Sequence, residues 1–334
     1  MKILILHQAV PEGAPPDERD VLAQAEAVAE GLRSLGHEAL PWPCTMDLAR
    51  LRSELEAEAP DCAWNIVESL GGHGRLIAHV PALLDALGIP YTGAPAEAMF
   101  LTSNKILGKA WLQACGLPVP PTVATWPVRL PEVPSEAALP PSTMYVVKSV
   151  WEHASIGLDE ETLVKGASPG PEALAARAAA LGGACFAEPF VEGREFNLSL
   201  LAGGADSPEV LPPAEIDFGA FPEGKPHLVG YRAKWDDGSF EYHHTPRRFD
   251  FPAGDERLLS LLGKLARRAW RHLGLRGYAR VDFRVDSAER PWILEVNANP
   301  CISPDAGFVA AAERCGLTFA QVVERILADT PLRR

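Results

Sequence analysis

Two neighbouring segments read Arg280-Val281-Asp282-Phe283-Arg284-Val285 and Trp292-Ile293-Leu294-Glu295-Val296-Asn297-Ala298-Asn299-Pro300. Polar and apolar residues alternate in both segments, and a short turn separates them. Successive side chains of a β-strand point to opposite faces, so this pattern predicts a β-hairpin. Arg280, Asp282 and Arg284 then share one face of their strand. Glu295, Asn297 and Asn299 share one face of theirs, with the apolar residues on the opposite side.

The polar residues of this hairpin include two carboxylates, Asp282 and Glu295, and the amide oxygen of Asn297. Hard oxygen ligands of this kind suit Mg²⁺, which proteins hold through one or two carboxylates together with substrate phosphates. Spacing alone favours a metal site no more than it favours a solvated hairpin face. Both readings stay open on the residues alone.

The first hundred residues alternate between strand and helix patterns. Apolar runs at 2–7, 37–41 and 62–67 predict strands, and helical spacing at 17–35, 48–59 and 76–87 predicts helices. This order favours a parallel sheet with helices on its faces. The glycine-rich loop at 71–74 lacks the G-x-G-x-x-G spacing after a first strand, so a dinucleotide site is not expected there.

A second unit begins near Ser103, with a helix at 104–115 and strands at 144–150 and 185–190. A Pro-rich stretch at 127–141 between them is expected to be a surface loop. The last unit holds β-rich runs at 196–201, 229–234, 279–285 and 292–297, and helices at 258–273 and 319–327. We predict three domains with boundaries at 1–102, 103–187 and 188–334.

The composition excludes several classes of protein. The chain has 334 residues, 47% hydrophobic content and a formal net charge of -13, so it has no general reason to bind nucleic acid or an anionic membrane. Six cysteines with no C-x-x-C pair argue against a structural zinc site or a disulfide framework. No apolar run is long enough to span a bilayer, and the opening apolar run is too short for a signal peptide. We expect a cytoplasmic protein.

Taken together, these pieces resemble the ATP-grasp superfamily and, within it, D-alanine-D-alanine ligase. The resemblance runs from the first strand to Phe308. It is strongest in the hairpin, in Gly88-Ile89-Pro90-Tyr91-Thr92-Gly93, and in Asn104-Lys105 with Gly116-Leu117-Pro118-Val119-Pro120. It implies an α+β protein with the ATP-grasp fold: an N-terminal α/β, Rossmann-like domain with a parallel sheet, followed by two α+β lobes that hold ATP between them.

The resemblance also implies roles for individual residues. The ligands of Mg²⁺, or of Mn²⁺ in its place, are Asp282, Glu295 and Asn297. The nucleotide is held by Lys105 and Lys148 at the phosphates, Glu188 at the adenine and Glu195 at the ribose, with Leu294 also beside it. The reaction depends on Arg280 at the developing oxyanion, Lys234 and Ser155 on loops that cover the phosphates, and Glu18 at the amine of the first substrate.

The implied reaction is the activation of a carboxylate by ATP, followed by attack of an amine on the acylphosphate. Transfer of a phosphoryl group to a carboxylate brings two anions together, so the dense positive charge at the matched lysines suits it. The products are ADP and phosphate, the substrates are amino acids or small peptides, and a homodimer is possible as in the resembling family. Two alternatives remain: a non-enzymatic ATP-binding regulator of the same fold, and a true D-alanine-D-alanine ligase.

The substrate end departs from the resembling family. Glu68 stands where the family has a histidine, Trp235 where it has a tyrosine, and Cys301 where it has a glycine. Ala306 and Gly307 replace the serine and leucine that hold the carboxylate of the amine substrate. Loss of a hydroxyl donor to a carboxylate removes a hydrogen bond worth about 1.5–3 kcal/mol. We therefore predict weak D-alanyl-D-alanine synthesis and an amine substrate that is larger or differently charged.

Overall fold

The N-terminal sheet is parallel and is covered on both faces. The computed structural model describes residues 1–127, 143–203 and 208–332. In it, β1 (Lys2–Gln8) lies between β2 (Glu38–Cys44) and β3 (Cys62–Asn65). Ile3 and Ile5 share one apolar core with α1 (Pro16–Ser34). Leu4 and Leu6 face the other way, toward α2 (Leu48–Glu58) and α3 (His79–Leu87). Burial on both faces explains the unbroken apolar run of β1 and confirms the predicted α/β domain.

The small lobe is a four-stranded antiparallel sheet in the order β4-β7-β5-β6. Its strands are β4 (Ala124–Trp126), β5 (Met144–Ser149), β6 (Leu163–Lys165) and β7 (Cys185–Pro189), and α6 (Pro171–Ala178) packs against β4 and β7. The predicted boundary between residues 187 and 188 falls inside β7. The Pro-rich stretch at 127–141 lies outside the described residues apart from Pro127.

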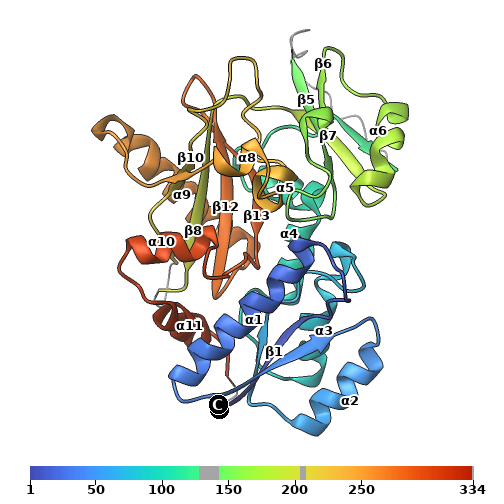
Figure 1. Cartoon of the computed structure of the whole chain (residues 1–334), viewed down its shortest axis with the longest axis vertical. Coiled ribbons are helices and arrows are strands. Elements are labelled where there is room, and N and C mark those ends of the chain that lie inside the picture. Colours follow the sequence, from blue (N-terminus) through green and yellow to red (C-terminus); the bar gives the residue numbers. More distant parts are fainter. Residues whose placement is uncertain (128–142, 204–207, 333–334) are drawn as a thin grey trace.

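The C-terminal lobe holds the largest sheet, in the order β11-β10-β8-β12-β13, with β9 beside β8 (Figure 1). The strands are β8 (Arg194–Leu201), β9 (Glu209–Val210), β10 (Ala214–Ile216), β11 (Arg247–Arg248), β12 (Tyr278–Val285) and β13 (Pro291–Asn297). The helices α4 (Ala96–Ser103), α5 (Lys105–Ala114) and α9 (Glu256–Leu273) pack on one face of this sheet and share its apolar core. The opposite face of β12 and β13 is thereby left free for polar side chains.

We expected a β-rich run at 229–234, and this prediction is wrong. Residues Tyr231–Trp235 form the short helix α7, followed by α8 (Phe240–His243). No strand in the described part of the chain pairs with this segment, and its backbone bonds to a loop instead: Tyr231 N–H donates to Leu158 O at 2.9 Å. Alternating apolar residues form a strand only where a neighbouring strand accepts their hydrogen bonds.

The last two helices return to the N-terminal domain. α10 (Gly307–Arg314) and α11 (Phe319–Ala328) follow the large sheet, and α11 lies beside α1 (Figure 1). Val323 approaches Gly31 of α1 so closely that an added Cβ would stand 3.1 Å from it. The N-terminal sheet and the end of the chain therefore share one core. None of the described helices has the length and apolar character needed to cross a membrane.

Candidate active site

The β12–β13 hairpin brings the predicted metal ligands onto one face. Arg280 pairs with Asn297 and Asp282 pairs with Glu295, and directly paired residues of antiparallel strands point the same way. The register then shifts after Asp282, so that two residues of β13 stand against one of β12. A bulge of this kind turns neighbouring side chains to the same side. Leu294 and Glu295 accordingly both line the cavity.

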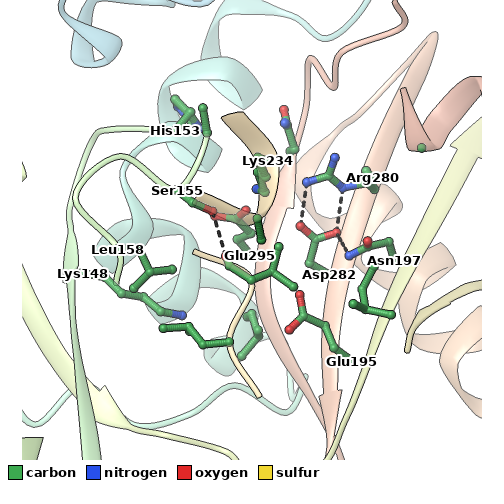
Figure 2. A pocket seen from close by; sticks show the side chains of 18 of the residues that line it. Lys148, His153, Ser155, Leu158, Glu195, Asn197, Lys234, Arg280, Asp282 and Glu295 are labelled. Carbon is green, nitrogen blue, oxygen red and sulfur yellow. Dashed lines mark hydrogen bonds and ion pairs between the residues drawn. The ribbon is translucent and has the colours of Figure 1, made fainter. Parts of the chain in front are cut away.

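Asp282 is held by its neighbours on the sheet. Arg280 donates to it from Nε at 2.7 Å and from Nη2 at 2.8 Å, and Asn197 Nδ2 donates at 2.9 Å (Figure 2). The two parallel hydrogen bonds from Arg280 fix the positions of the Asp282 carboxylate, an expected metal ligand, and of the Arg280 guanidinium, which is expected at the oxyanion. The remaining guanidinium nitrogen of Arg280 has no hydrogen-bond partner in the part of the chain that the structure describes, so it can donate to a ligand. Asn297 Oδ1 accepts from the backbone N–H of Asn299 at 3.0 Å.

Three lysines from different elements meet the hairpin at a cavity of about 320 Å³. Lys105 begins α5, whose first turn is capped by Asn104, and its Nζ lies 3.9 Å from Glu295 Oε2. Lys148 extends from β5, and Lys234 from α7 (Figure 2). Burial and the nearby Arg280 lower the pKa of Lys234. Such crowding of cations is stabilised by an anionic ligand.

Glu295 is the anion that faces these cations. Burial raises the pKa of its carboxyl, but Lys105, Lys234 and Arg280 lower it more, and the result is a pKa of about 2. Glu295 is therefore ionised at any working pH. It can serve as an oxygen ligand without first losing a proton.

The two glutamates expected beside the nucleoside are both buried in ion pairs. Glu188 Oε1 lies 2.7 Å from Lys148 Nζ, and its other oxygen bonds the buried Lys109. Burial opposes the charge of Glu188, yet the two lysines hold its pKa below the usual range. Glu195 Oε2 lies 2.8 Å from Arg284 Nη2. Both glutamates line the cavity, but their contacts with a nucleotide stay a prediction.

The loop after β5, which contains Ser155, and the segment at α7 lie together over the cavity. We call these two segments the cover of the cavity. Ser155 Oγ donates to Val229 O at 3.1 Å, and Trp235 Nε1 donates to Ala154 O at 3.1 Å. Ala154 and Ser155 both have a positive φ, of 57° and 61°. Non-glycine residues hold this conformation only where the surroundings enforce it, which is common in loops that clamp a ligand. Tyr231, unnoticed in the sequence, donates from its hydroxyl to Asp17 Oδ1 at 2.7 Å.

His153 is a further cavity residue that the sequence did not single out. Its Nε2 is buried and has no hydrogen-bond partner among the described residues. Burial and the nearby Lys105 lower its pKa to about 3, so the ring is neutral. A buried polar atom without a partner is rare, and it belongs to a residue that lines the cavity where phosphates are expected.

The end of the cavity next to the N-terminal domain is acidic. Asp17, Asp20 and Glu68 line it, whereas the predicted Glu18 is half-buried on α1 and is not among the lining residues. Asp17 and Asp20 are three residues apart, so they share a helix face that Glu18 does not. Burial and the charge of Asp20 raise the pKa of Glu68 to about 7.

Cys301 lies at the same end and is not an activated nucleophile. Its Sγ lies 2.9 Å from Asp20 Oδ2, and Ser303 Oγ donates to Asp20 Oδ1 at 3.0 Å. Burial, with Glu68 and Asp20 nearby, raises the pKa of the thiol well above its usual value. A thiol that resists ionisation is a poor nucleophile, which leaves Cys301 as a neighbour that positions Asp20.

The donor set on the hairpin suits a hard cation that shares its ligands with a substrate. No group of three or more His, Cys, Asp or Glu side chains in the described ranges can hold a metal by itself. Asp282, Glu295 and Asn297 supply two carboxylates and one amide oxygen in the cavity that Lys105, Lys148 and Lys234 also line. Mg²⁺ commonly takes its remaining ligands from water and substrate phosphates, which fits this set.

Known proteins match both the sequence and the fold. The family described as D-ala D-ala ligase C-terminus matches residues 112–328. The D-alanine--D-alanine ligase of Synechococcus sp. (strain JA-3-3Ab) is 32% identical, over 98% of this chain and 93% of its own. That of Desulforudis audaxviator is 34% identical, over 93% of this chain and 94% of its own.

Among solved structures, the D-alanine--D-alanine ligase of Bacillus anthracis complexed with ATP has a TM-score of 0.71 at 18% identity, covering 98% of this chain and 97% of that one. D-alanyl-alanine synthetase A of Vibrio cholerae has a TM-score of 0.70 at 19% identity and covers 98% of both chains. These likenesses confirm the predicted fold. From the sequence matches, the chain belongs to the D-alanine-D-alanine ligase family and is an ATP-dependent, peptide-bond-forming ligase with the ATP-grasp fold.

Proposed function

We propose that this ligase joins the carboxylate of one amino acid to the amine of a second amino acid or small peptide, and that this second substrate is larger than D-alanine or differently charged. The relatives are named for D-alanine, which supports amino acids as the substrate class. One observation carries the proposal: a single cavity is lined by Lys105, Lys148 and Lys234 and, from the N-terminal domain, by Asp17, Asp20 and Glu68, with Arg280 close enough to shift the pKa of both Lys234 and Glu68.

The cationic end suits the triphosphate of ATP. Lys105, Lys148 and Lys234 would offset the charge of the phosphates, and this offset lets an anionic carboxylate approach the γ-phosphorus. Arg280 is fixed by Asp282, so its free nitrogen would hold the oxyanion that forms when the amine attacks. Transfer of the γ-phosphoryl group to the carboxylate leaves ADP, and attack of the amine on the acylphosphate then forms the amide bond and releases phosphate.

The hairpin would hold Mg²⁺, or Mn²⁺ in its place, through Asp282, Glu295 and Asn297. When bound, the ion supplies positive charge at the phosphate oxygens. The residues themselves contribute oxygen ligands that need no further change. Glu295 is ionised because its pKa is about 2, and Asp282 is fixed in place by two hydrogen bonds from Arg280.

The acidic end would bind the ammonium group of the carboxylate-donating amino acid. Asp20 is fixed by Cys301 and Ser303, and Asp17 accepts from Tyr231 of the covering segment. A closed cover excludes water, which would otherwise hydrolyse the acylphosphate. A substrate amine in this place would therefore be bound and shielded by the same contacts.

Two alternatives differ in what they require. A non-enzymatic ATP-binding regulator has no use for a fixed oxyanion arginine, and membership in a family of ligases disfavours it. A true D-alanine-D-alanine ligase agrees with the relatives' names. Against it stand Glu68, Ala306 and Gly307, which change the charge and the shape of the substrate end.

The proposal is tested by phosphate release at saturating ATP with a panel of amino acids and dipeptides, singly and in pairs. We expect phosphate release only when one compound can serve as the carboxylate donor and another as the amine acceptor, with ADP as the nucleotide product. Turnover with D-alanine alone above roughly 1 per second, within the usual range of enzymes, would show the substrate assignment to be wrong. Release of AMP in place of ADP would overturn the reaction itself.

We further propose a cytoplasmic location and a homodimer. The first is supported by the small-molecule, ATP-dependent reaction of the family, and the second rests only on the resemblance. Sedimentation velocity at micromolar concentration distinguishes a monomer of 36.0 kDa from a dimer directly.

A further inference from the structure

Arg247 is a cation of the cavity to which the sequence comparison gives no role. It lies on β11, at the edge of the large sheet, and its side chain lines the cavity near Ala306 and Gly307. Nη1 donates to Asp305 O at 3.2 Å. The guanidinium lies close to Gly307: a Cβ added there would stand 2.9 Å from Nε and 3.4 Å from Cζ.

Burial and the charge of Arg280 lower the pKa of the Arg247 guanidinium, and the smaller attraction of Asp305 and Cys301 opposes them. Arg280 lines the same cavity. Ala306, the N-cap of α10, has no side-chain hydrogen bond, so the first N–H groups of that helix are left for another acceptor. Among the described carboxylates, none forms an ion pair with Arg247. Asp305 is exposed, and only its backbone oxygen contacts the guanidinium.

Its neighbour Arg248 shows the contrast. Arg248 Nη2 lies 2.6 Å from Glu215 Oε2, and its side chain is not among those that line the cavity. One arginine of β11 therefore serves the structure of the sheet, while the other faces the substrate space. Arg280 is already paired with Asp282, so among the described residues at this place it is the charge of Arg247 that no carboxylate pairs.

We infer that Arg247 is a specificity-determining residue that binds an anionic group, a carboxylate in the first instance, on the amine substrate. The inference rests on the proposed ligation and narrows its second substrate to an amine that carries a negative charge. ATP is served by Lys105, Lys148 and Lys234, which come from other elements. The absence of side chains beyond Cβ at Ala306 and Gly307 gives the guanidinium its access.

The contact with Arg247 compensates for the serine that the resembling family has at the position of Ala306. A hydroxyl at that position would donate one hydrogen bond to a carboxylate. A guanidinium offers several donors in a planar fork and a full charge, and it is the side chain best suited to bind a carboxylate with two hydrogen bonds. Arg247 therefore replaces, from another strand, the recognition that the sequence pattern had lost.

Calorimetric titration of the enzyme loaded with ADP and Mg²⁺ tests the inference without requiring turnover. The probes are glycine, D-alanine, β-alanine and γ-aminobutyrate, each compared with its amide. We expect wild-type enzyme to bind at least one acid more tightly than its amide. Arg247→Gln should weaken binding of that acid about tenfold or more and leave the amide unchanged. Arg247→Lys should keep part of the preference, and Arg248→Gln should keep all of it.

Gly307→Ala supplies a second, charge-neutral perturbation. The new Cβ forces the guanidinium aside, so this variant should lose part of the preference for the acid. In the Arg247→Gln background the same change should add little, because the group that it displaces is gone. Equal additive effects in both backgrounds would contradict the contact.

Three results would overturn the inference: no wild-type preference for any acid over its amide, an equal loss of acid and amide binding in Arg247→Gln, or a loss confined to ADP. The proposed ligation fails separately. If the acids bind as expected but none supports phosphate release with any carboxylate donor, the reaction is wrong while the role of Arg247 as an anion-binding residue stands.

Discussion

Replacing Tyr231 with phenylalanine is expected to loosen the closed cover of the cavity. The Tyr231 hydroxyl joins this cover to Asp17 of the N-terminal domain at 2.7 Å. Burial and Asp17 raise the pKa of Tyr231 to about 12, so the hydroxyl stays protonated and donates at any working pH. The contacts of Ser155 and Trp235 join the same segment to the small lobe and are unaffected by the change.

The size of the effect follows from the bond that is lost. A hydrogen bond to a charged group contributes about 1.5–3 kcal/mol, and the lower end applies because Asp17 and Tyr231 are only half-buried. A loss of about 1.5 kcal/mol lowers the ratio of closed to open enzyme about tenfold. Water then reaches the acylphosphate more often. We expect more phosphate released than peptide bond formed, and a KM for the carboxylate substrate about tenfold higher.

The assay compares phosphate released with peptide product formed in the same reaction, at saturating ATP. Tyr242→Phe is the matched control, because Tyr242 lies on α8, is exposed and does not line the cavity. The control should release one phosphate for each peptide bond. A Tyr231→Phe enzyme with that same ratio and an unchanged KM would refute the role of this contact.

Further predictions concern the metal, the core and pH. Glu295→Ala should fold normally but lose activity more than about a hundredfold, and chelation of divalent cations should stop wild-type turnover until Mg²⁺ or Mn²⁺ is restored; a folded, fully active variant would contradict the site. Lys109→Met breaks an ion pair with Glu188 in which both side chains are buried, and should lower the free energy of unfolding by about 3 kcal/mol in urea titrations. Glu68 has a pKa of about 7 when folded, above the 4.5 of an ordinary glutamate, so its contribution to stability is complete below about pH 4.5 and is lost as pH rises through 7. Glu68→Gln should flatten that decline, and unfolding measured at pH 5 and pH 8 checks it.

Local patterns in the sequence were enough to predict the hairpin and the parallel sheet of the N-terminal domain. Alternation in β12 and β13 is a property of neighbouring residues, and the pairing of Asp282 with Glu295 follows once the hairpin closes. The segment at α7 failed for the opposite reason, because a strand needs a partner that the local sequence does not show. Its helix is fixed by a loop more than seventy residues away in the chain.

The substrate end was predicted less well, because it depends on orientation and on distant contacts. Asp17 and Asp20 face the cavity in place of Glu18 because α1 begins at Pro16, and a shift of one residue turns a helical side chain by about 100°. Arg247 lies in no motif. Its position over Gly307 arises from the meeting of β11 with α10, which the sequence shows only as two segments about sixty residues apart.

Transfer of oxygen from the donor carboxylate to phosphate tests the central claim most directly. The carboxylate substrate is labelled with ¹⁸O, the ligation is run to completion, and the released phosphate and nucleotide are examined by mass spectrometry. An acylphosphate formed with the γ-phosphoryl group requires the released phosphate to carry one labelled oxygen, with none in the nucleotide. Label found in AMP, or phosphate released without label while peptide product forms, would contradict the account.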